Sequence, residues 1–183
     1  MARIVANDRK FKELILYVAE HCAGDVAFGA TKLNKILYYA DFLAYGDFGQ
    51  PITGQPYFRL PKGPGPRYLK PIQAEMVKDG EIELLTATRY AFQQIRTIPR
   101  RKADLSLFSA EEVALVDEVI AALGPLNASE ASELSHELLL GWQVVGDRED
   151  IPYSTVFLSD ELPDDAHIER AQQLAREHGW LAA

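Results

Sequence analysis

The segment from Thr31 to Tyr45 constrains the fold most, because a helix built from it would be apolar or aromatic on nearly all sides. One stripe at helical spacing consists of Leu33, Ile36, Leu37, Ala40 and Leu43, and a second consists of Asn34, Tyr38, Asp41, Phe42 and Tyr45. A helix of this composition is usually central and buried. We therefore predict a central helix that begins near Thr31 and ends by Gly46. The alternative is that its aromatic stripe contacts a partner protein.

Further helices are predicted on both sides of this segment from apolar stripes and capping residues. The first helix is predicted to begin at Asp8 and to end at about Cys22. Two later helices are predicted to begin at Ser109 and at Asn127, because Glu112 and Glu130 complete a capping box with these residues. The last helix is predicted to begin at Pro163. The residues expected to face the core are Ala131, Leu134 and Leu138 in the helix after Asn127, and Ile168, Ala171 and Leu174 in the last helix.

A small β element is predicted in the middle of the chain. The segment Tyr57–Leu60 is typical of a short strand, and residues 81–86 and 90–98 are typical of a hairpin. Three prolines lie between residues 61 and 66, so this stretch is expected to be a rigid turn and not a central strand.

A third helix is predicted to follow the proline-rich turn. It begins at Pro66, or nearer to Lys70 if Pro71 is not inside it, and it ends at Asp79–Gly80. With the elements above, the sequence predicts a mainly α (α+β) fold, a compact helical domain with a small antiparallel β element.

The composition is that of one globular domain. Of the 183 residues, 48 % are hydrophobic and 25 % are charged. We expect a single domain over residues 1–183, with a core at about 10–155 and a C-terminal helical extension at 156–183. No apolar run approaches the roughly 18 residues of a membrane span, and no signal-peptide core follows Met1. We therefore expect a cytoplasmic protein that has no contact with a membrane.

The charge is divided unevenly along the chain. Residues 1–103 contain 16 Lys and Arg against 10 Asp and Glu, whereas residues 104–183 contain 3 against 17. The division indicates two faces with different partners, an acidic part that folds against a basic part, or simply an acidic solvated surface. The acidic total, −8, argues against nucleic acid as the main ligand.

The residue types that carry catalysis or bind metals are not arranged in a known pattern. The four histidines, at positions 21, 136, 167 and 178, lack the spacing of a metal site. The only cysteine, Cys22, lies on an apolar stripe, which favours a core residue over a nucleophile. Prolines in the segment from Lys62 to Pro66 remove N–H donors that a phosphate loop needs. We predict no catalytic residues, no metal site and no cofactor.

Several uncommon motifs occur in a characteristic order. They are Lys32-Leu-Asn-Lys35 followed by Tyr38 and Asp41, then Pro51–Gly54, Tyr57–Pro64, Asp79–Gly80, Trp142 and Ile151–Tyr153. In these motifs the chain resembles the Panacea domain family, which includes SocA-like antitoxins and phage-associated GepA-type proteins. The resemblance covers residues 10 to 155.

The resemblance implies a compact, mainly helical domain that acts as the antitoxin of a toxin–antitoxin pair. The implied partner is a cognate protein toxin, and one branch of the family is linked to delivery of a toxin to a protease. No catalytic residues come with the family. Some relatives carry an added DNA-binding segment, for which there is no room before residue 8, so direct DNA binding is not expected. The oligomeric state stays open, and the alternative from another class is a small mobile-element enzyme or nucleotide-binding regulator.

Candidate functional residues come from the same motifs. The predicted partner-binding residues, a mixed aromatic and charged set, are Tyr38, Tyr39, Asp41, Tyr45, Arg59, Lys62 and Tyr68. The predicted structural residues are Lys32, Leu33, Asn34, Lys35, Pro61, Gly63, Pro64, Trp142, Ile151 and Tyr153. For Asn34 and Asp41 the other interpretation is that they bond buried backbone groups and dock loops on the helix. Trp142 and Tyr153 are expected to be packing anchors with one polar group each.

Overall fold

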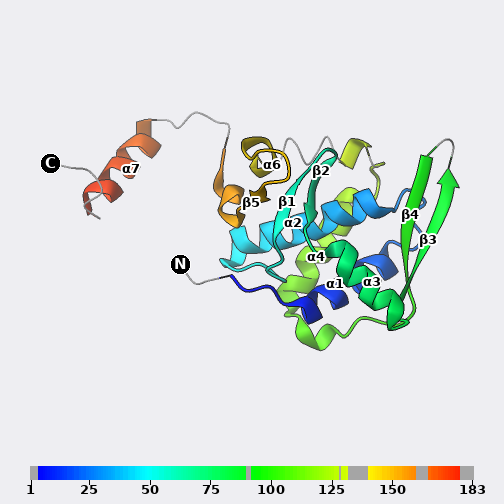
Figure 1. Ribbon diagram of the computed structural model, residues 1–183. Coiled ribbons are helices and arrows are strands. Elements are labelled where there is room, and N and C mark those ends of the chain that lie inside the picture. Colours follow the sequence, from blue (N-terminus) through cyan, green and yellow to red (C-terminus); the bar gives the residue numbers. More distant parts are fainter. Residues whose placement is uncertain (1–3, 90–91, 128, 132–139, 160–164, 178–183) are drawn as a thin grey trace.

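A computed structural model describes residues 4–89, 92–127, 129–131, 140–159 and 165–177, and it is mainly α-helical with two small antiparallel sheets (Figure 1). The predicted fold class is confirmed. The helices are α1 (Asp8–His21), α2 (Ala30–Phe48), α3 (Leu69–Lys78), α4 (Ala110–Leu123), α6 (Gly141–Val144) and α7 (Asp165–Glu177), with short 3-10 helices η1 (Leu105–Leu107) and η2 (Tyr153–Phe157). The strands are β1 (Tyr57–Leu60), β2 (Gly63–Pro66), β3 (Ile82–Arg89), β4 (Phe92–Pro99) and β5 (Asp150–Ile151).

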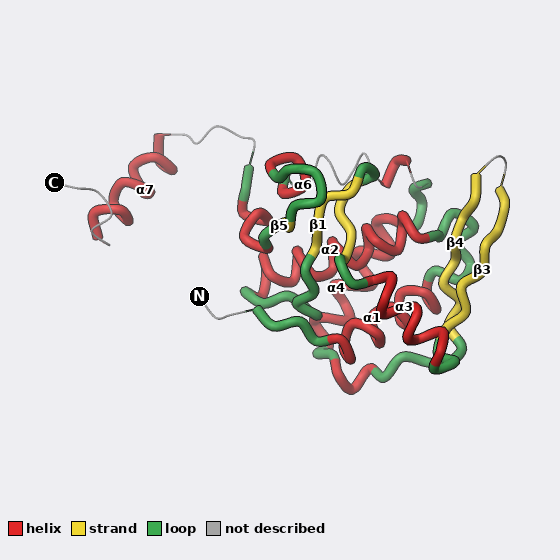
Figure 2. The backbone as a smooth tube through the Cα atoms, viewed as in Figure 1, coloured by secondary structure: helices red, strands yellow, loops and turns green. Residues whose placement is uncertain are grey.

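Helix α2 lies at the centre of the body, as predicted (Figure 2). It contacts α1, α4, β2, β4 and η2, so neighbours surround it on most sides. The aliphatic stripe is almost fully buried, and Phe42 of the aromatic stripe is also inaccessible. The helix ends at Phe48 because Gly49 adopts a left-handed conformation with φ 73°.

The first helix has a different cap from the predicted one. Asn7, not Asp8, is the N-cap, and its side chain accepts a hydrogen bond from the Lys10 backbone N–H at 3.0 Å. The Asp8 carboxylate instead accepts a 2.7 Å hydrogen bond from the side chain of Gln55. Asn and Asp are both favourable N-cap residues. Asp8 is bonded to Gln55 in the loop before β1, and Asn7 takes the N-cap position.

The strand at Gly63–Pro66 corrects the expectation of a turn throughout residues 61–66. β2 pairs antiparallel with β1, with Tyr57 opposite Pro66 and Leu60 opposite Gly63. The strand order is β2-β1-β5, so β2 is an edge strand and its prolines need no N–H for a further neighbour. Only Pro61 and Lys62 form the turn, and β1 itself is where it was predicted.

Helix α3 begins at Leu69, which resolves the two alternatives in favour of the later start. Pro71 is therefore the third helical residue, where a backbone N–H would have no intrahelical acceptor. The helix ends before Gly80, whose φ of 72° is left-handed. The β3–β4 hairpin that follows is confirmed and longer than predicted, with Ile82 opposite Pro99 and Arg89 opposite Phe92.

The later helices agree only in part with the predictions. The capping box of α4 is present, because Ser109 and Glu112 exchange hydrogen bonds of 2.9 and 3.2 Å between side chain and backbone. The side chain of Asn127 accepts from the backbone of Ser129 and Glu130, as its signal predicted. Ala131 is buried, and Leu134 and Leu138 lie outside the described residues.

The last helix corrects a prediction. Pro163 lies outside the described residues, and α7 begins by Asp165. Its expected inward residues do not reach the core, since Ile168 is 42 % exposed and Ala171 is also exposed. Figure 1 shows the reason: α7 stands apart from the body of the protein.

A buried carboxylate fixes the loop between α2 and β1. Asp41 is inaccessible, and its oxygens accept hydrogen bonds from the Thr53 backbone N–H at 2.6 Å, from the Thr53 hydroxyl, and from the Tyr57 hydroxyl at 2.8 Å. Burial raises the pKa of Asp41, and the hydrogen bonds from Thr53 and Tyr57 act in the opposite direction. This confirms the interpretation that Asp41 docks a loop on the helix.

Replacing Asp41 by alanine should lower the free energy of unfolding by about 3 kcal/mol, because the backbone N–H and hydroxyl of Thr53 lose their acceptor, and the Tyr57 hydroxyl keeps only the Leu37 oxygen. Urea denaturation followed by circular dichroism measures the change. Asp47→Ala on the exposed side of the same helix is the matched control and should change stability by no more than about 0.5 kcal/mol. Equal effects of the two substitutions would contradict a docking role for Asp41.

Candidate functional site

The structure places three of the predicted partner-binding residues in the interior. Tyr38 and Asp41 are 0 % exposed and Tyr39 is 4 % exposed. Tyr38 packs against Phe42 and Tyr57, with ring centroids 4.2 and 5.6 Å apart. The expectation that these three side chains lie on a surface open to a partner is therefore wrong, because α1, α4, β2, β4 and η2 cover α2 on most of its sides.

The motif lysines of α2 are interior residues with structural contacts. The Lys32 ammonium donates to the backbone oxygens of Gly124 and Leu126 at 2.9 and 2.7 Å, at the C-terminal end of α4, and it pairs with Asp25 at 2.5 Å. A cation there complements the helix dipole and the last carbonyl groups. Lys35 is also buried, and this burial lowers its pKa to about 7. The neighbouring Leu33 is 1 % exposed.

An arginine–aromatic cluster covers the β1–β2 hairpin and the adjoining α6. The Arg59 guanidinium lies 4.4 Å from the centre of the Trp142 ring, and that of Arg67 lies 4.6 Å from the Phe58 ring. Tyr68 follows Arg67 directly and is 50 % exposed. We use the name arginine–aromatic cluster for Phe58, Arg59, Arg67, Tyr68 and Trp142.

Hydrogen bonds to the backbone hold this cluster in place. Arg59 donates to the Val145 oxygen at 2.6 Å, and the Trp142 indole donates to the Leu60 oxygen at 2.9 Å. Arg67 donates to Asp150 and to the backbone oxygen of Arg148. The side chains are thus fixed before any partner arrives. Trp142 has the one polar contact that was expected of it.

Sequence analysis missed Phe58 and Arg67. Their contact follows from the register of the β1–β2 hairpin, in which Phe58 lies opposite Gly65, two residues before Arg67. The contact was missed because residues 61–66 were predicted to form a turn, whereas residues 63–66 form the second strand of a hairpin. Had Gly63–Pro66 been assigned as an edge strand, the arginine would have been expected beside the phenylalanine.

Most of the remaining family-motif residues are buried. Tyr153 is 8 % exposed and its hydroxyl donates to the Gln55 oxygen at 2.7 Å, so it is the expected packing anchor. Ile151 is buried and pairs with Tyr57. Gly63 and Pro64 are buried in β2, whereas Pro61 is exposed in the turn. The amide of Asn34 lies about 3.3 Å from where a side chain on Gly65 would begin, so glycine there lets α2 and β2 approach closely.

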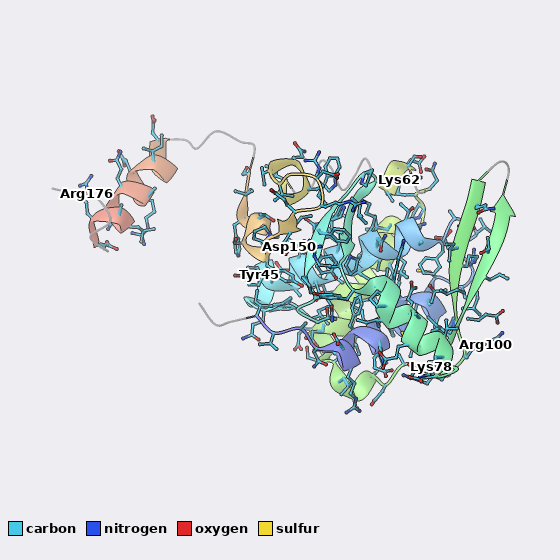
Figure 3. All side chains as sticks on the ribbon, viewed as in Figure 1. Tyr45, Lys62, Lys78, Arg100, Asp150 and Arg176 are labelled. Carbon is cyan, nitrogen blue, oxygen red and sulfur yellow. The ribbon has the colours of Figure 1, made fainter. Side chains whose placement is uncertain are left out.

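The structure separates the remaining surface residues into two places. Figure 3 shows Lys62 at the turn between β1 and β2, and Tyr45 near the C-terminal end of α2. Tyr45 is half-buried and contacts Tyr153 and Phe157, with ring centroids 5.6 and 5.9 Å apart. Arg59 and Tyr68 belong to the same β1–β2 hairpin region as Lys62, whereas Tyr45 lies near the end of α2.

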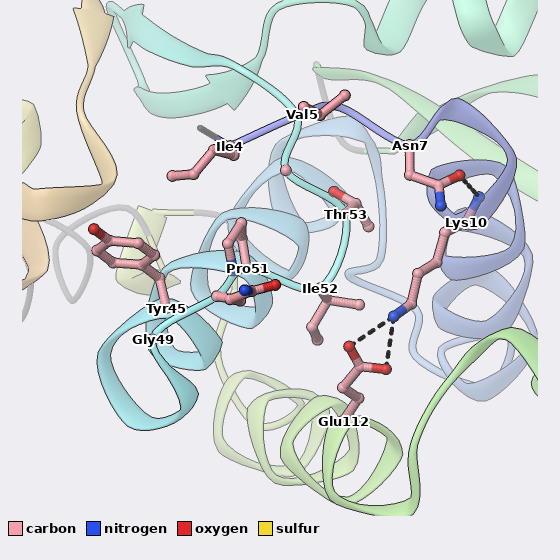
Figure 4. Close-up of a pocket in the computed structure, with 12 residues that line it drawn as sticks. Ile4, Val5, Asn7, Lys10, Tyr45, Gly49, Pro51, Ile52, Thr53 and Glu112 are labelled. Carbon is pink, nitrogen blue, oxygen red and sulfur yellow. Dashed lines mark hydrogen bonds and ion pairs between the residues drawn. The ribbon is translucent and has the colours of Figure 1, made fainter. Parts of the chain in front are cut away.

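A cleft of about 500 Å³ lies beside Tyr45 (Figure 4). Its walls are the N-terminal segment at Ile4 and Val5, the loop from Gly49 to Gly54, and the start of α4. The charged groups that line it, Lys10 and Glu112, are paired with each other at 2.6 Å. The cleft is thus a loop-lined hollow whose charges are already satisfied.

The histidines and the cysteine of the described part form no reactive group. No cluster of three or more potential metal ligands occurs among the residues that the structure describes. His21 lies on the Tyr17 ring, with its Nδ1 2.8 Å from the Tyr17 oxygen. Cys22 is 4 % exposed, and burial raises the pKa of its thiol to about 11. Within the described ranges, no helix has the length and apolarity to cross a membrane.

Comparison with known families identifies the chain. The family model described as "Antitoxin SocA-like, Panacea domain" matches residues 33–143, more than half of the 183 residues. The chain belongs to this family. No curated protein and no solved structure matched. The match extends from α2 to α6, so all five residues of the arginine–aromatic cluster lie inside the Panacea domain, and α7 lies beyond its matched end.

The thiol of Cys22 should react slowly in the folded protein. Relative to a thiol of pKa 9, a pKa of about 11 lowers the thiolate fraction at pH 8 roughly 100-fold, and burial slows access further. Labelling with an aromatic disulfide reagent, followed by absorbance, should be at least about 100-fold slower in buffer than in urea. Equal rates in the two solutions would show that Cys22 is an accessible thiol.

Proposed function

We propose that this chain is a cytoplasmic antitoxin that binds a co-encoded protein toxin directly and neutralises it by occupying its surface. The family match carries the antitoxin role, and the arginine–aromatic cluster is the observation that supports a site for the contact. The chain acts in this proposal by stoichiometric binding and not by catalysis.

The composition of the cluster suits a protein interface. Tyrosine, tryptophan and arginine are the residue types that most often dominate binding energy when they are buried by a partner. Here two guanidinium groups are already stacked on aromatic rings and bonded to backbone oxygens. Their side chains lose little further freedom on binding, which favours affinity. Tyr68, half-exposed at the start of α3, offers the largest free aromatic area of the cluster.

The toxin contact is tested by co-expression with the neighbouring open reading frame, followed by binding of the two purified proteins. The neighbouring protein should arrest growth alone and be harmless in the presence of this chain. Tyr68→Ala should weaken binding about 30-fold, the equivalent of about 2 kcal/mol for a central tyrosine. Lys78→Ala, at the end of α3, is the matched control and should change affinity less than about twofold.

Three results would contradict parts of the proposal. A neighbouring protein that stays toxic beside this chain would exclude neutralisation of that partner. Binding that Tyr68→Ala and Lys78→Ala weaken equally would remove the arginine–aromatic cluster as the interface. Neutralisation that disappears in cells lacking an ATP-dependent protease, while binding persists, would replace occlusion by delivery of the toxin for degradation.

A further inference from the structure

The C-terminal end of α2 carries exposed aromatic and aliphatic side chains outside the arginine–aromatic cluster. Phe48 is 48 % exposed, Phe157 is 65 % exposed and Leu158 is 46 % exposed. Tyr45 connects them, because it lies one helical turn before Phe48 and its ring centroid is 5.9 Å from that of Phe157. We call Tyr45, Phe48, Phe157 and Leu158 the aromatic patch.

The patch rests on a rigid base. η2 packs along the end of α2, and Gly46 faces the side chain of Val156. Tyr153 stacks on Phe42 with ring centroids 4.6 Å apart, which ties η2 to the core. The backbone segments that carry the exposed side chains are therefore held together, as the base of a docking site must be.

Helix α7 has an apolar stripe in which Ile168 and Ala171 are exposed and Leu174 and Ala175 are half-buried. The stripe consists of Ile168, Ala171, Leu174 and Ala175, at the spacing of one helix face. The polar side chains bond to one another along the helix, Arg170 to Gln173 at 2.9 Å and Gln173 to Glu177 at 2.8 Å. Their hydrogen bonds are satisfied within α7, so docking of the stripe would leave them undisturbed.

A helix of 13 residues is too short to be stable alone in water. A helix of this length gains stability when it buries an apolar face. The aromatic patch is the exposed apolar surface that directly precedes α7 in the sequence, because Phe157 and Leu158 belong to it. Leu158 and Asp165 are seven residues apart, which spans up to about 23 Å. The tether therefore reaches the patch, and a short tether gives an effective concentration of about millimolar, which favours docking within one chain over docking between two.

We propose that α7 docks through its apolar stripe on the aromatic patch of its own chain. The residue sizes suit this docking, because the stripe alternates the small Ala171 and Ala175 with Ile168 and Leu174, and the patch offers the large rings of Phe48 and Phe157. The docked helix covers the patch beside the cleft at Tyr45. The inference is independent of the toxin contact, which involves the other surface.

Limited digestion of the full-length chain with trypsin tests the docking. Arg170 and Arg176 of α7 are the cleavage sites, and intact mass follows their loss. A variant with Phe48→Asp and Phe157→Asp leaves α7 itself unchanged and should raise the cleavage rate at Arg170 about tenfold or more, because an undocked helix unfolds readily. Val26→Asp, an equally exposed apolar position at 63 % exposure in the loop after α1, should leave the rate within about twofold of the wild type.

Each outcome decides the proposal. Slow reaction of Cys22 in every variant shows that the body remains folded. Equal cleavage rates in the wild type and in the patch variant would overturn docking of α7 on the patch. Protection that increases with protein concentration would overturn docking within one chain and replace it by exchange of α7 between two copies. Toxin neutralisation is not the readout, so none of these results bears on the proposed function.

Discussion

The burial of the Asp41 carboxylate is the interaction on which the rest of the structure depends. A carboxyl group at the centre of a protein is costly unless hydrogen-bond partners surround it, and Thr53 and Tyr57 supply these partners. Thr53 holds the loop, and its backbone oxygen accepts from the N–H of Asn7, the cap of α1. Tyr57 begins the central strand of the β2-β1-β5 sheet. One carboxylate thereby sets the positions of the first helix, the loop and the hairpin that presents the arginine–aromatic cluster.

The uneven charge along the chain is partly resolved in three dimensions. Lys10 pairs with Glu112 at 2.6 Å, Arg9 with Asp104 at 3.4 Å and Arg67 with Asp150 at 2.5 Å. Each pair joins the basic part to the acidic part, as expected if an acidic part of the chain folds against a basic part. The Lys10–Glu112 pair has the most effect, because both side chains are largely shielded, whereas the exposed Arg9–Asp104 pair contributes little.

The two surfaces proposed here differ in how they arise. The arginine–aromatic cluster lies inside the region that the Panacea family model matches, and its side chains are fixed by hydrogen bonds to backbone oxygens. The aromatic patch is built on η2, which follows the matched region together with α7. The surface proposed for toxin contact thus lies inside the matched region, and the surface proposed for docking of α7 uses residues that follow it.

The sequence by itself determined the central helix, the capping box at Ser109 and the position of β1, because each follows from local spacing and capping chemistry. It also indicated that Asp41 could dock a loop. The tertiary structure decided that Tyr38 and Tyr39 are buried, that Gly63–Pro66 is an edge strand and that Arg67 contacts Phe58. The physical reason is that burial and strand register depend on residues distant in sequence, which no local pattern encodes.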